Sequence, residues 1–520
     1  MIPVLIAGGG PVGMTLARTL ASFGVRCRLV ERNGSTTRHP KMDITNGRSM
    51  ELFRRLGLAD KLRAVAVPEA NNFDVSWITA LDRASGGREM HRFRYPSVVE
   101  KRAEIRRRND GTQPREPAMR VSQVMIEPVL RAAIEGDPLI DARWGIALED
   151  FVQDGDGVTA TLRHQESGAA ETVRCAFLAG CDGGSSVVRE RLGIGLEGRA
   201  AVTQRYMIHF RSRAHDLLQA FGIAWHYQTP LGTLIAQDDD DTWTLQTRPP
   251  PGADLEHVDP EPILDAWAGR PFAREILVAN PWTPHLLLAE RYAEGRVLLA
   301  GDAAHQYIPT GGYGMNTGIG DAVDLGWKLA AVLRGGATPA LLATYESERR
   351  PIGLRNRLAS ERHTGVRLQI AEAYRTITDP EALGRAIAAL GNAENESWGI
   401  EFGYRYDGVE GDPIRYEPTT APGARLPSVF LRDGSALYDR LGRWFTLLVF
   451  GGADPSPLID GAPLPLDTVI VDDESLVPLY EARLVLVRPD THVAWRGDHC
   501  ADGRAVWRAV LGGGQRRRRA

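Results

Sequence analysis

Residues 301–316 of the chain read GDAAHQYIPTGGYGMN. They follow a short apolar run at 297–300, which predicts a buried strand, and they precede a helical pattern that ends near Leu333. Five of these residues are glycine or proline, which is typical of tight turns and of backbone that closely approaches a ligand. Asp302 comes just after the strand, at the edge where open α/β sheets bind ligands. The stretch predicts a strand–loop–helix corner whose helix N-terminus would stabilise negative charge; the alternative is a corner that needs glycine only for packing.

A second glycine motif stands near the start of the chain. An apolar run at 2–7 leads into GGGPVG at residues 8–13, then a helical pattern and a second apolar run that ends at Glu31. This order is the one that dinucleotide-binding domains need. Gly8 would make the turn, Gly10 would let the backbone approach a pyrophosphate, and Gly13 would let helix and sheet pack closely. Glu31 would accept hydrogen bonds from a ribose, which favours FAD or NAD over NADP at this site.

The bulk composition limits the classes of function. The chain has 520 residues, of which 43% are hydrophobic and 25% charged, with a formal net charge of −4. A length of this size predicts two or three domains, and the charge offers no general attraction to nucleic acid or to anionic membranes. The four cysteines form no Cys-x-x-Cys pair, so we expect no zinc or dithiol site. With no apolar stretch of about 18 residues, we expect a cytoplasmic protein without a membrane contact.

The order of patterns predicts an α/β protein with interrupted domains. Residues 202–285 change character: they suggest strands without intervening helices and are rich in Trp, Tyr and His, which favours an antiparallel sheet inserted into a Rossmann-like domain. The final part returns to strands separated by Pro- and Gly-rich turns. The predicted division is a nucleotide-binding domain at 1–75, 101–200 and 286–395 (the last with a helical connector), a substrate domain at 76–100 and 201–285, and a third domain at 396–520.

Two segments carry more specific expectations. Residues 101–115 are rich in charge and include Arg106, Arg107 and Arg108, which predicts a solvated loop. Residues 341–372 show a helical pattern that we expect to be interrupted at Pro351, because proline lacks the N–H of a helix interior.

A third motif, Asp182-Gly183, follows a predicted strand at 173–179. In their order and spacing the three motifs resemble those of the single-component FAD-dependent aromatic hydroxylases, the group A flavoprotein monooxygenases. The residues LVRPDTHVAWR at 486–496 resemble the cysteine-free, thioredoxin-like domain of the phenol hydroxylase and aromatic polyketide hydroxylase branch. Tyr313 stands where this family commonly has glutamine.

The resemblance implies an FAD enzyme that is reduced by NADH or NADPH and uses O₂. A flavin C4a-hydroperoxide would then hydroxylate a phenolic or hydroxypyridine-like aromatic ring. No metal is implied, and a homodimer remains open. The residues assigned to the cofactor are Gly8, Gly10, Pro11, Gly13, Glu31, Arg32, Arg48, Gln123, Asp182, Asp302, Pro309, Gly311, Gly312, Gly314, Met315 and Asn316.

Hydroxylation of a phenol needs a base, because losing a proton makes the ring a better nucleophile. Asp43 is our candidate, since it precedes Arg48 by the offset at which phenol hydroxylases of this family carry a catalytic acid. His209, His226 and Tyr227 are alternative candidates, although aromatic residues in strands more often belong to the core or to the wall of a pocket. Two other functions stay open: an FAD dehydrogenase that does not use O₂, and a flavin-binding protein that sequesters an aromatic drug. The sequence does not choose between catabolism and natural-product biosynthesis.

Overall fold

The computed structural model describes residues 1–520 except 251, 256, 410 and 513–520. Its largest sheet has the strand order β18-β19-β10-β1-β2-β7, so it joins distant parts of the chain. The strands are β18 (Ala293–Glu294), β19 (Val297–Leu299), β10 (Ala170–Gly180), β1 (Ile2–Ala7), β2 (Cys27–Glu31) and β7 (Ile140–Trp144), with β8 (Ile146–Gln153) and β9 (Val158–His164) extending from β10. From β19 to β7 neighbouring strands are parallel. The loops that follow β1, β10 and β19 therefore leave the same edge, where α/β sheets bind ligands.

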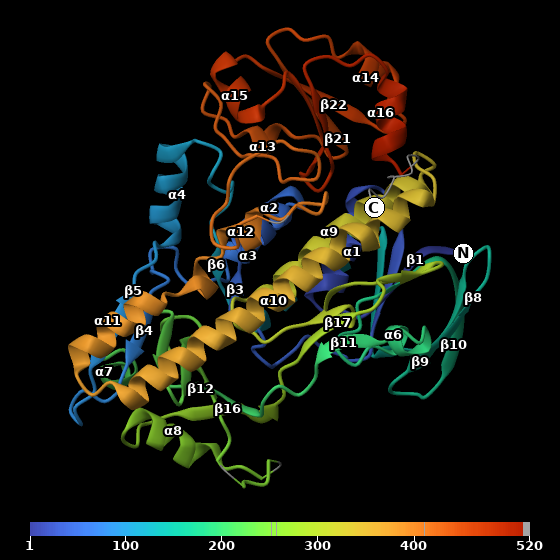
Figure 1. Ribbon diagram of the computed structural model, residues 1–520. Coiled ribbons are helices and arrows are strands. Elements are labelled where there is room, and N and C mark those ends of the chain that lie inside the picture. Colours follow the sequence, from blue (N-terminus) through green and yellow to red (C-terminus); the bar gives the residue numbers. More distant parts are fainter. Residues whose placement is uncertain (251, 256, 410, 513–520) are drawn as a thin grey trace.

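Helices pack on this sheet through small side chains. Helices α1 (Pro11–Ser22) and α9 (Tyr313–Leu333) are in direct contact. A Cβ added to Gly326 of α9 would lie 2.5 Å from Thr19 Cγ2 of α1, so only glycine permits this approach. Figure 1 shows α10 (Ala340–Thr376) running across the molecule from the region of α9 to α11 (Pro380–Leu390).

The predicted inserted sheet is present and draws on two parts of the chain. Its order is β16-β12-β15-β14-β13-β4-β5. The strands are β16 (Glu275–Trp282), β12 (Arg205–Arg211), β15 (Thr242–Thr247), β14 (Gly232–Ala236), β13 (His226–Thr229), β4 (Val75–Ile78) and β5 (Glu89–Phe93). All neighbours are antiparallel except β13 and β4, which are parallel. One face packs with α7 (His215–Leu218) and α8 (Pro260–Ala268), and the other with α10 and α11.

The C-terminal part forms a sheet of its own, above the rest of the molecule in Figure 1. Its order is β22-β21-β23-β24, in which β21 and β22 are parallel and the other pairs antiparallel. Its elements are α13 (Leu437–Arg440), β21 (Phe445–Phe450), α14 (Ser456–Asp460), β22 (Leu466–Val471), α15 (Val477–Tyr480), β23 (Leu484–Val487), β24 (Val493–Gly497) and α16 (Gly503–Val510). This order of strands and helices agrees with the predicted thioredoxin-like fold.

Shorter elements connect these units. They are α2 (Gly47–Arg55), α3 (Ala59–Arg63), α5 (Gln123–Glu135), α6 (Val187–Arg191), α12 (Trp398–Phe402) and the small sheets β3 (Ile44–Thr45) with β6 (Met119–Arg120) and β11 (Leu196–Arg199) with β17 (Leu286–Ala289) and β20 (His305–Gln306). None of the described helices combines the length and apolarity that crossing a membrane requires.

The expectation of a loop at 101–115 was wrong for its first half, because residues 98–108 form helix α4 (Val98–Arg108). Ser97 and Glu100 make a reciprocal capping box at its start, which satisfies two N–H groups that the helix leaves free. Glu104 pairs with Lys101 at 2.9 Å and with Arg108 at 3.1 Å. The charges that suggested a loop are therefore spaced to support a helix.

The expected interruption at Pro351 was also wrong, because α10 continues through it. Proline removes one hydrogen bond from a helix interior. Here the neighbouring Arg349, Ile352 and Asn356 are buried, and packing of that face outweighs the local cost.

Candidate functional site

The glycines of the first loop have different physical roles. Gly8 has a φ of +111°, and a Cβ added to it would lie 2.2 Å from the carbonyl oxygen of Cys181. A Cβ on Gly13 would lie 2.0 Å from the carbonyl oxygen of Gly8. At Gly10 no described atom comes within 4 Å of an added Cβ. Gly8 and Gly13 thus serve close packing, whereas Gly10 borders open space.

Helix α1 begins at this open space and points its N-terminus into it. Pro11 occupies the first turn, Gly10 is the N-cap, and among the described residues no side chain caps the helix and no acid stands in its first turn. Such an end attracts anions. Glu31, at the end of β2, accepts hydrogen bonds from Gly9 N at 2.8 Å and from Asn33 N at 2.9 Å. The neighbouring Arg32 is exposed.

The loop after β19 packs directly on the first loop. A Cβ added to Gly301 would lie 2.9 Å from Val12 Cγ2, so the two loops are in contact. The side chain of Asp302 is accessible to solvent, but the protein packed around it weakens its solvation. This raises the pKa of its carboxyl group above the ordinary value, against the opposing effect of His305 and Lys41. The structure thus brings the first and last predicted motifs together at one edge of the sheet.

The middle motif joins them. Asp182 follows β10, and its Oδ2 accepts a hydrogen bond from Val188 N at 3.1 Å. Its Oδ1 is buried and has no partner among the described residues, and burial raises the pKa of this carboxyl group. An unpaired buried acceptor needs a donor. The open space at Gly10, the uncapped helix and this free acceptor together fit the diphosphate and hydroxyl-rich chain of FAD.

The second half of the 301–316 stretch is hydrogen-bonded to strand β3 and to the residue after it. Gly311 and Gly312 have φ values of +87° and +65°, which favour glycine. Asn316 Nδ2 donates to Ile44 O at 3.2 Å, and its Oδ1 accepts from Asn46 N at 3.1 Å. Gly312, the N-cap of α9, has no described side-chain cap. This loop therefore presents free N–H groups beside residues 44–46.

The remaining residues predicted for this loop lie as follows. Pro309 is exposed, Gly314 has no described atom within 4 Å of an added Cβ, and Met315 is half-buried against the core. Tyr313 is buried, and its hydroxyl lies 2.7 Å from His363 Nε2 and 2.8 Å from Ser397 Oγ. Tyr313 thus anchors the loop to α10 and to the segment before α12.

A cavity of about 250 Å³ borders this loop. Its walls are largely aromatic and apolar, and include Ile44, Phe73, Trp225, Gly311, Tyr313 and Trp398. Pockets with such linings and a few polar groups bind flat organic ligands. The cavity lies between the 311–316 loop, β3, α4 and the inserted sheet.

The candidate base Asp43 stands beside this cavity. Its Oδ2 accepts from Trp225 Nε1 at 3.1 Å and lies 3.1 Å from His226 Nε2. Its Oδ1 has no hydrogen bond with any described residue, and its side chain is 20% exposed. His226 Nδ1 is buried without a described partner. Ile44 and Trp225, the neighbours of this pair, line the cavity.

Two other candidates lie apart from Asp43. Tyr227 follows His226 on β13 and so points to the other face of the sheet, where it is fully buried and its hydroxyl donates to Gly222 O at 2.5 Å. His209 is buried on β12, with Nδ1 3.0 Å from Trp243 O. Tyr227 belongs to the core on the far face of the sheet, whereas the strand register places His209 on the same face as His226.

Arg48 and Gln123 use their side chains within the protein. Arg48 is 4% exposed and donates to Thr491 Oγ1 at 2.7 Å and to Asp490 O at 2.6 Å. Gln123 Nε2 donates to Glu127 Oε1 at 2.7 Å. The side chain of Arg48 contacts the C-terminal part, and the cofactor roles of Arg48 and Gln123 stay predictions.

Two further residues of the site, Asp321 and Glu401, were not predicted from the sequence. Asp321 is fully buried and accepts from Gly301 N at 3.2 Å, so it holds the loop that carries Asp302. Glu401 lines the cavity and accepts from Gly47 N at 2.5 Å. The sequence signal for Asp321 is an acid in a mostly apolar helix, a signal that it shares with Asp324. No sequence pattern indicated Glu401, because 354 positions separate it from its partner Gly47.

Relative to a Glu401→Gln variant, the wild type is expected to lose about 1–3 kcal/mol of unfolding free energy between about pH 5 and pH 7. Burial raises the pKa of Glu401 from 4.5 to about 7. The folded protein thus keeps a proton that the unfolded chain releases, and its stability falls as pH rises through this window. Urea unfolding at several pH values measures the difference. Glu417→Gln, at an exposed acid, should follow the wild type, and parallel curves for Glu401→Gln would contradict the assignment.

Family models match both ends of the chain. The model described as an FAD binding domain matches residues 1–357, and the one described as the C-terminal part of aromatic-ring hydroxylases matches residues 419–513. The first match includes all three predicted motifs, at residues 8–13, 182–183 and 301–302.

Curated relatives are similar over nearly the whole chain. The FAD-dependent monooxygenase apdD of Emericella nidulans is 39% identical over 95% of this chain and 87% of its own length. The 4-methyl-5-nitrocatechol 5-monooxygenase of a Burkholderia species is 31% identical, with coverage of 96% and 95%. The tetracenomycin A2 monooxygenase-dioxygenase of Streptomyces glaucescens is 32% identical, with coverage of 97% and 95%.

Solved structures show the same architecture. The flavin-dependent monooxygenase PieE, in complex with FAD and substrate, superposes with a TM-score of 0.89 at 30% identity, covering 99% of both chains. RebC with bound 7-carboxy-K252c superposes with a TM-score of 0.87 at 32% identity and the same coverage.

Proposed function

Since this chain belongs to the FAD-dependent aromatic-ring monooxygenases, we propose that it hydroxylates a phenolic or hydroxypyridine-like ring with O₂ and NADH or NADPH. Two relatives are named for 4-methyl-5-nitrocatechol and for tetracenomycin A2, and a catechol is a hydroxylated aromatic ring. The observation that carries the proposal is the Asp43–His226 pair beside an aromatic-lined cavity that borders the 311–316 loop.

We assign the cofactor to the edge of the large sheet. The uncapped start of α1 would hold the diphosphate of FAD, Glu31 the adenosine ribose, and Asp182 and Asp302 hydroxyl groups of the central chain. The 311–316 loop would place its N–H groups against the isoalloxazine ring. When bound, FAD supplies the redox chemistry that activates O₂.

The protein's own residues would prepare the substrate. The aromatic walls of the cavity keep water from the reacting ring. The free Oδ1 of Asp43 would accept the proton of the substrate hydroxyl, and Trp225 and His226 would hold the other oxygen in place. Since the side chain of Asp43 is partly exposed, the proton can then pass to solvent. Loss of this proton leaves an electron-rich phenolate ring.

Gly10→Ala is expected to lower the affinity for FAD by about tenfold or more without changing the thermal stability of the FAD-free protein. Gly10 has a φ of −74°, which any residue adopts, and its added Cβ would enter open space. Gly13→Ala is the contrasting variant, because its Cβ would clash with Gly8 O and lower stability by about 1–3 kcal/mol. Fluorescence titration with FAD and thermal unfolding measure both effects. Normal FAD affinity in Gly10→Ala would place the diphosphate elsewhere.

The function is tested with a panel of phenols and pyridinols, scored for nicotinamide oxidation and for oxygenated product. We expect substrate to stimulate oxidation of NADH or NADPH, with one oxygen atom from O₂ in each product molecule. Substrate-linked flavin reduction without oxygenated product would support a dehydrogenase instead. Tight binding of FAD and an aromatic compound without any turnover would support a sequestering protein.

A further inference from the structure

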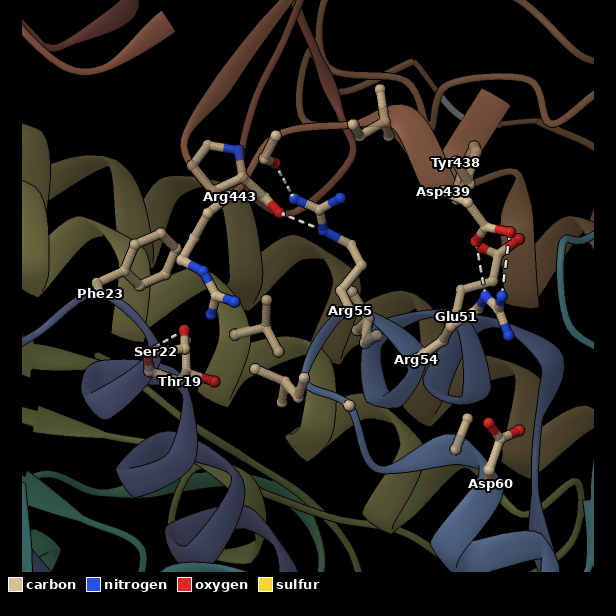
Figure 2. A pocket seen from close by; sticks show the side chains of 18 residues that line it. Thr19, Ser22, Phe23, Glu51, Arg54, Arg55, Asp60, Tyr438, Asp439 and Arg443 are labelled. Carbon is tan, nitrogen blue, oxygen red and sulfur yellow. Dashed lines mark hydrogen bonds and ion pairs between the residues drawn. The ribbon is translucent and has the colours of Figure 1, made fainter. Parts of the chain in front are cut away.

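A second cavity lies where the C-terminal part meets the first helices. It has a volume of about 490 Å³ and shares no lining residue with the cavity beside the 311–316 loop. Figure 2 shows its walls, formed by the end of α1, by α2 and the start of α3, and by residues of the C-terminal part that include Tyr438 and Arg443. The motifs of the cofactor site leave this cavity unexplained.

Two arginines reach into this cavity without an acidic partner. Arg55 donates to Gly442 O at 2.7 Å and to Pro489 O at 3.2 Å, and it forms no ion pair with a described residue. One of its terminal nitrogens makes no hydrogen bond with a described residue. Arg443 extends from the opposite wall past Phe23 (Figure 2), and it too has no ion pair with a described residue. Two guanidinium groups, neither in an ion pair with a described residue, therefore line one cavity.

The surroundings make this arrangement costly. Burial lowers the pKa of Arg55 to about 10, and the positive charges of Arg443 and Arg48 act in the same direction, whereas Tyr438 and Asp490 act against it. Two guanidinium groups that line the same cavity repel each other because their charges are alike. An anion that bridges them would remove this repulsion through charge-assisted hydrogen bonds.

The acids that line the cavity are mostly engaged elsewhere. Asp439 binds Arg54 through both oxygens, at 2.7 and 3.0 Å. Glu51 is held by Arg425, with Nε at 2.9 Å. Asp60 is exposed at the start of α3 and lies away from Arg443 in Figure 2. Asp439 and Glu51 are thus neutralised by other arginines, and Asp60 lies at the far rim, so positive charge dominates around Arg55 and Arg443.

We propose that this cavity binds the phosphate group of a small phosphorylated molecule, held between Arg55 and Arg443. A guanidinium fork matches the geometry of a phosphate. The volume exceeds what one phosphate needs, and the side chains of Phe23, Leu52 and Leu56 offer an apolar wall to an organic portion. Because its walls come from α2 and from the C-terminal part, the ligand would bridge the two and stabilise their packing.

The test is calorimetric titration of the FAD-saturated enzyme with inorganic phosphate and, separately, with ADP. Chloride keeps the ionic strength constant, and the flavin absorbance confirms that FAD stays bound. We expect saturable binding with a dissociation constant of about 1 mM or tighter. Tighter binding of ADP than of phosphate would identify a nucleotide-like ligand, and equal affinities would identify free phosphate.

Arg443→Gln is the decisive variant, because Arg443 is exposed and makes no bond that the fold requires. It should weaken binding by about tenfold or more. Arg508→Gln removes one charge from an exposed position in the same part of the chain, outside the cavity, and should bind like the wild type. Arg55→Gln should weaken binding at least as much. Absence of saturable binding to the wild type, or equal affinity in Arg443→Gln and Arg508→Gln, would overturn the proposal.

Discussion

Replacing Asp43 with asparagine is expected to lower the rate of hydroxylation by about 10²–10⁴-fold at neutral pH, while FAD remains bound. Asparagine keeps the size of the side chain and an oxygen for Trp225 and His226, which lie 3.1 Å from the present carboxylate. It cannot accept the proton of a substrate hydroxyl. The loss would therefore affect proton removal and leave the cavity intact.

The pH dependence separates a base from a structural residue. A phenol loses its proton in solution near pH 10, as the tyrosine side chain does, so the defect of Asp43→Asn should shrink as pH approaches that value. A structural defect would persist at every pH. Trp225→Phe is the matched control, because it removes one hydrogen bond to Asp43 and keeps the carboxylate. Unchanged turnover in Asp43→Asn would eliminate Asp43 as the base.

The second large effect is expected at Asp321, where replacement by asparagine should cost about 3–5 kcal/mol of stability and weaken FAD binding. Asp321 Oδ1 accepts from Arg349 Nε at 2.8 Å, and Oδ2 lies 2.8 Å from His305 Nε2. Burial acts to raise the pKa of Asp321, but Arg349 and His305 hold it below the ordinary value. Without the carboxylate, the buried charge of Arg349 has no counter-ion, and Gly301 loses an acceptor.

Urea unfolding and FAD titration measure these two consequences. Asp460→Asn, at an exposed acid on α14, should leave both values unchanged. The double variant Asp321→Asn with Arg349→Met should lose less stability than the two single variants lose together, because each single change already breaks the same pair. Full additivity would show that the two residues act independently.

Much of the fold could be predicted because its signals are local. The strand, glycine loop and helix of residues 2–22 follow from backbone requirements that act within a few residues, as the clash of an added Cβ at Gly13 with Gly8 O shows. The aromatic, helix-poor character of residues 202–285 likewise predicted the inserted sheet, and the family comparisons confirm the class of fold and enzyme. The helix α4 was missed because its capping box was overlooked among the charges.

The site was only partly predictable, since its geometry depends on contacts between distant residues. Asp43 and His226 are 183 positions apart, and their meeting depends on how β13 joins the inserted sheet. The roles assigned to Arg48 and Gln123 stay predictions, and the structure engages both side chains within the protein. Glu401 reaches Gly47 from the other end of the chain.

By itself the sequence determined most of the turns, strands and helices and the order of three nucleotide-binding motifs, whereas the continuation of α10 through Pro351 depends on packing. These properties depend on φ values, hydrophobic period and helix ends, which neighbouring residues set. The tertiary structure alone decided which face of each element meets which partner. On β13, His226 and Tyr227 are adjacent but point to opposite faces, so one reaches Asp43 and the other enters the core. In the same way, only packing of the C-terminal part against α2 brings Arg55 and Arg443 to one cavity.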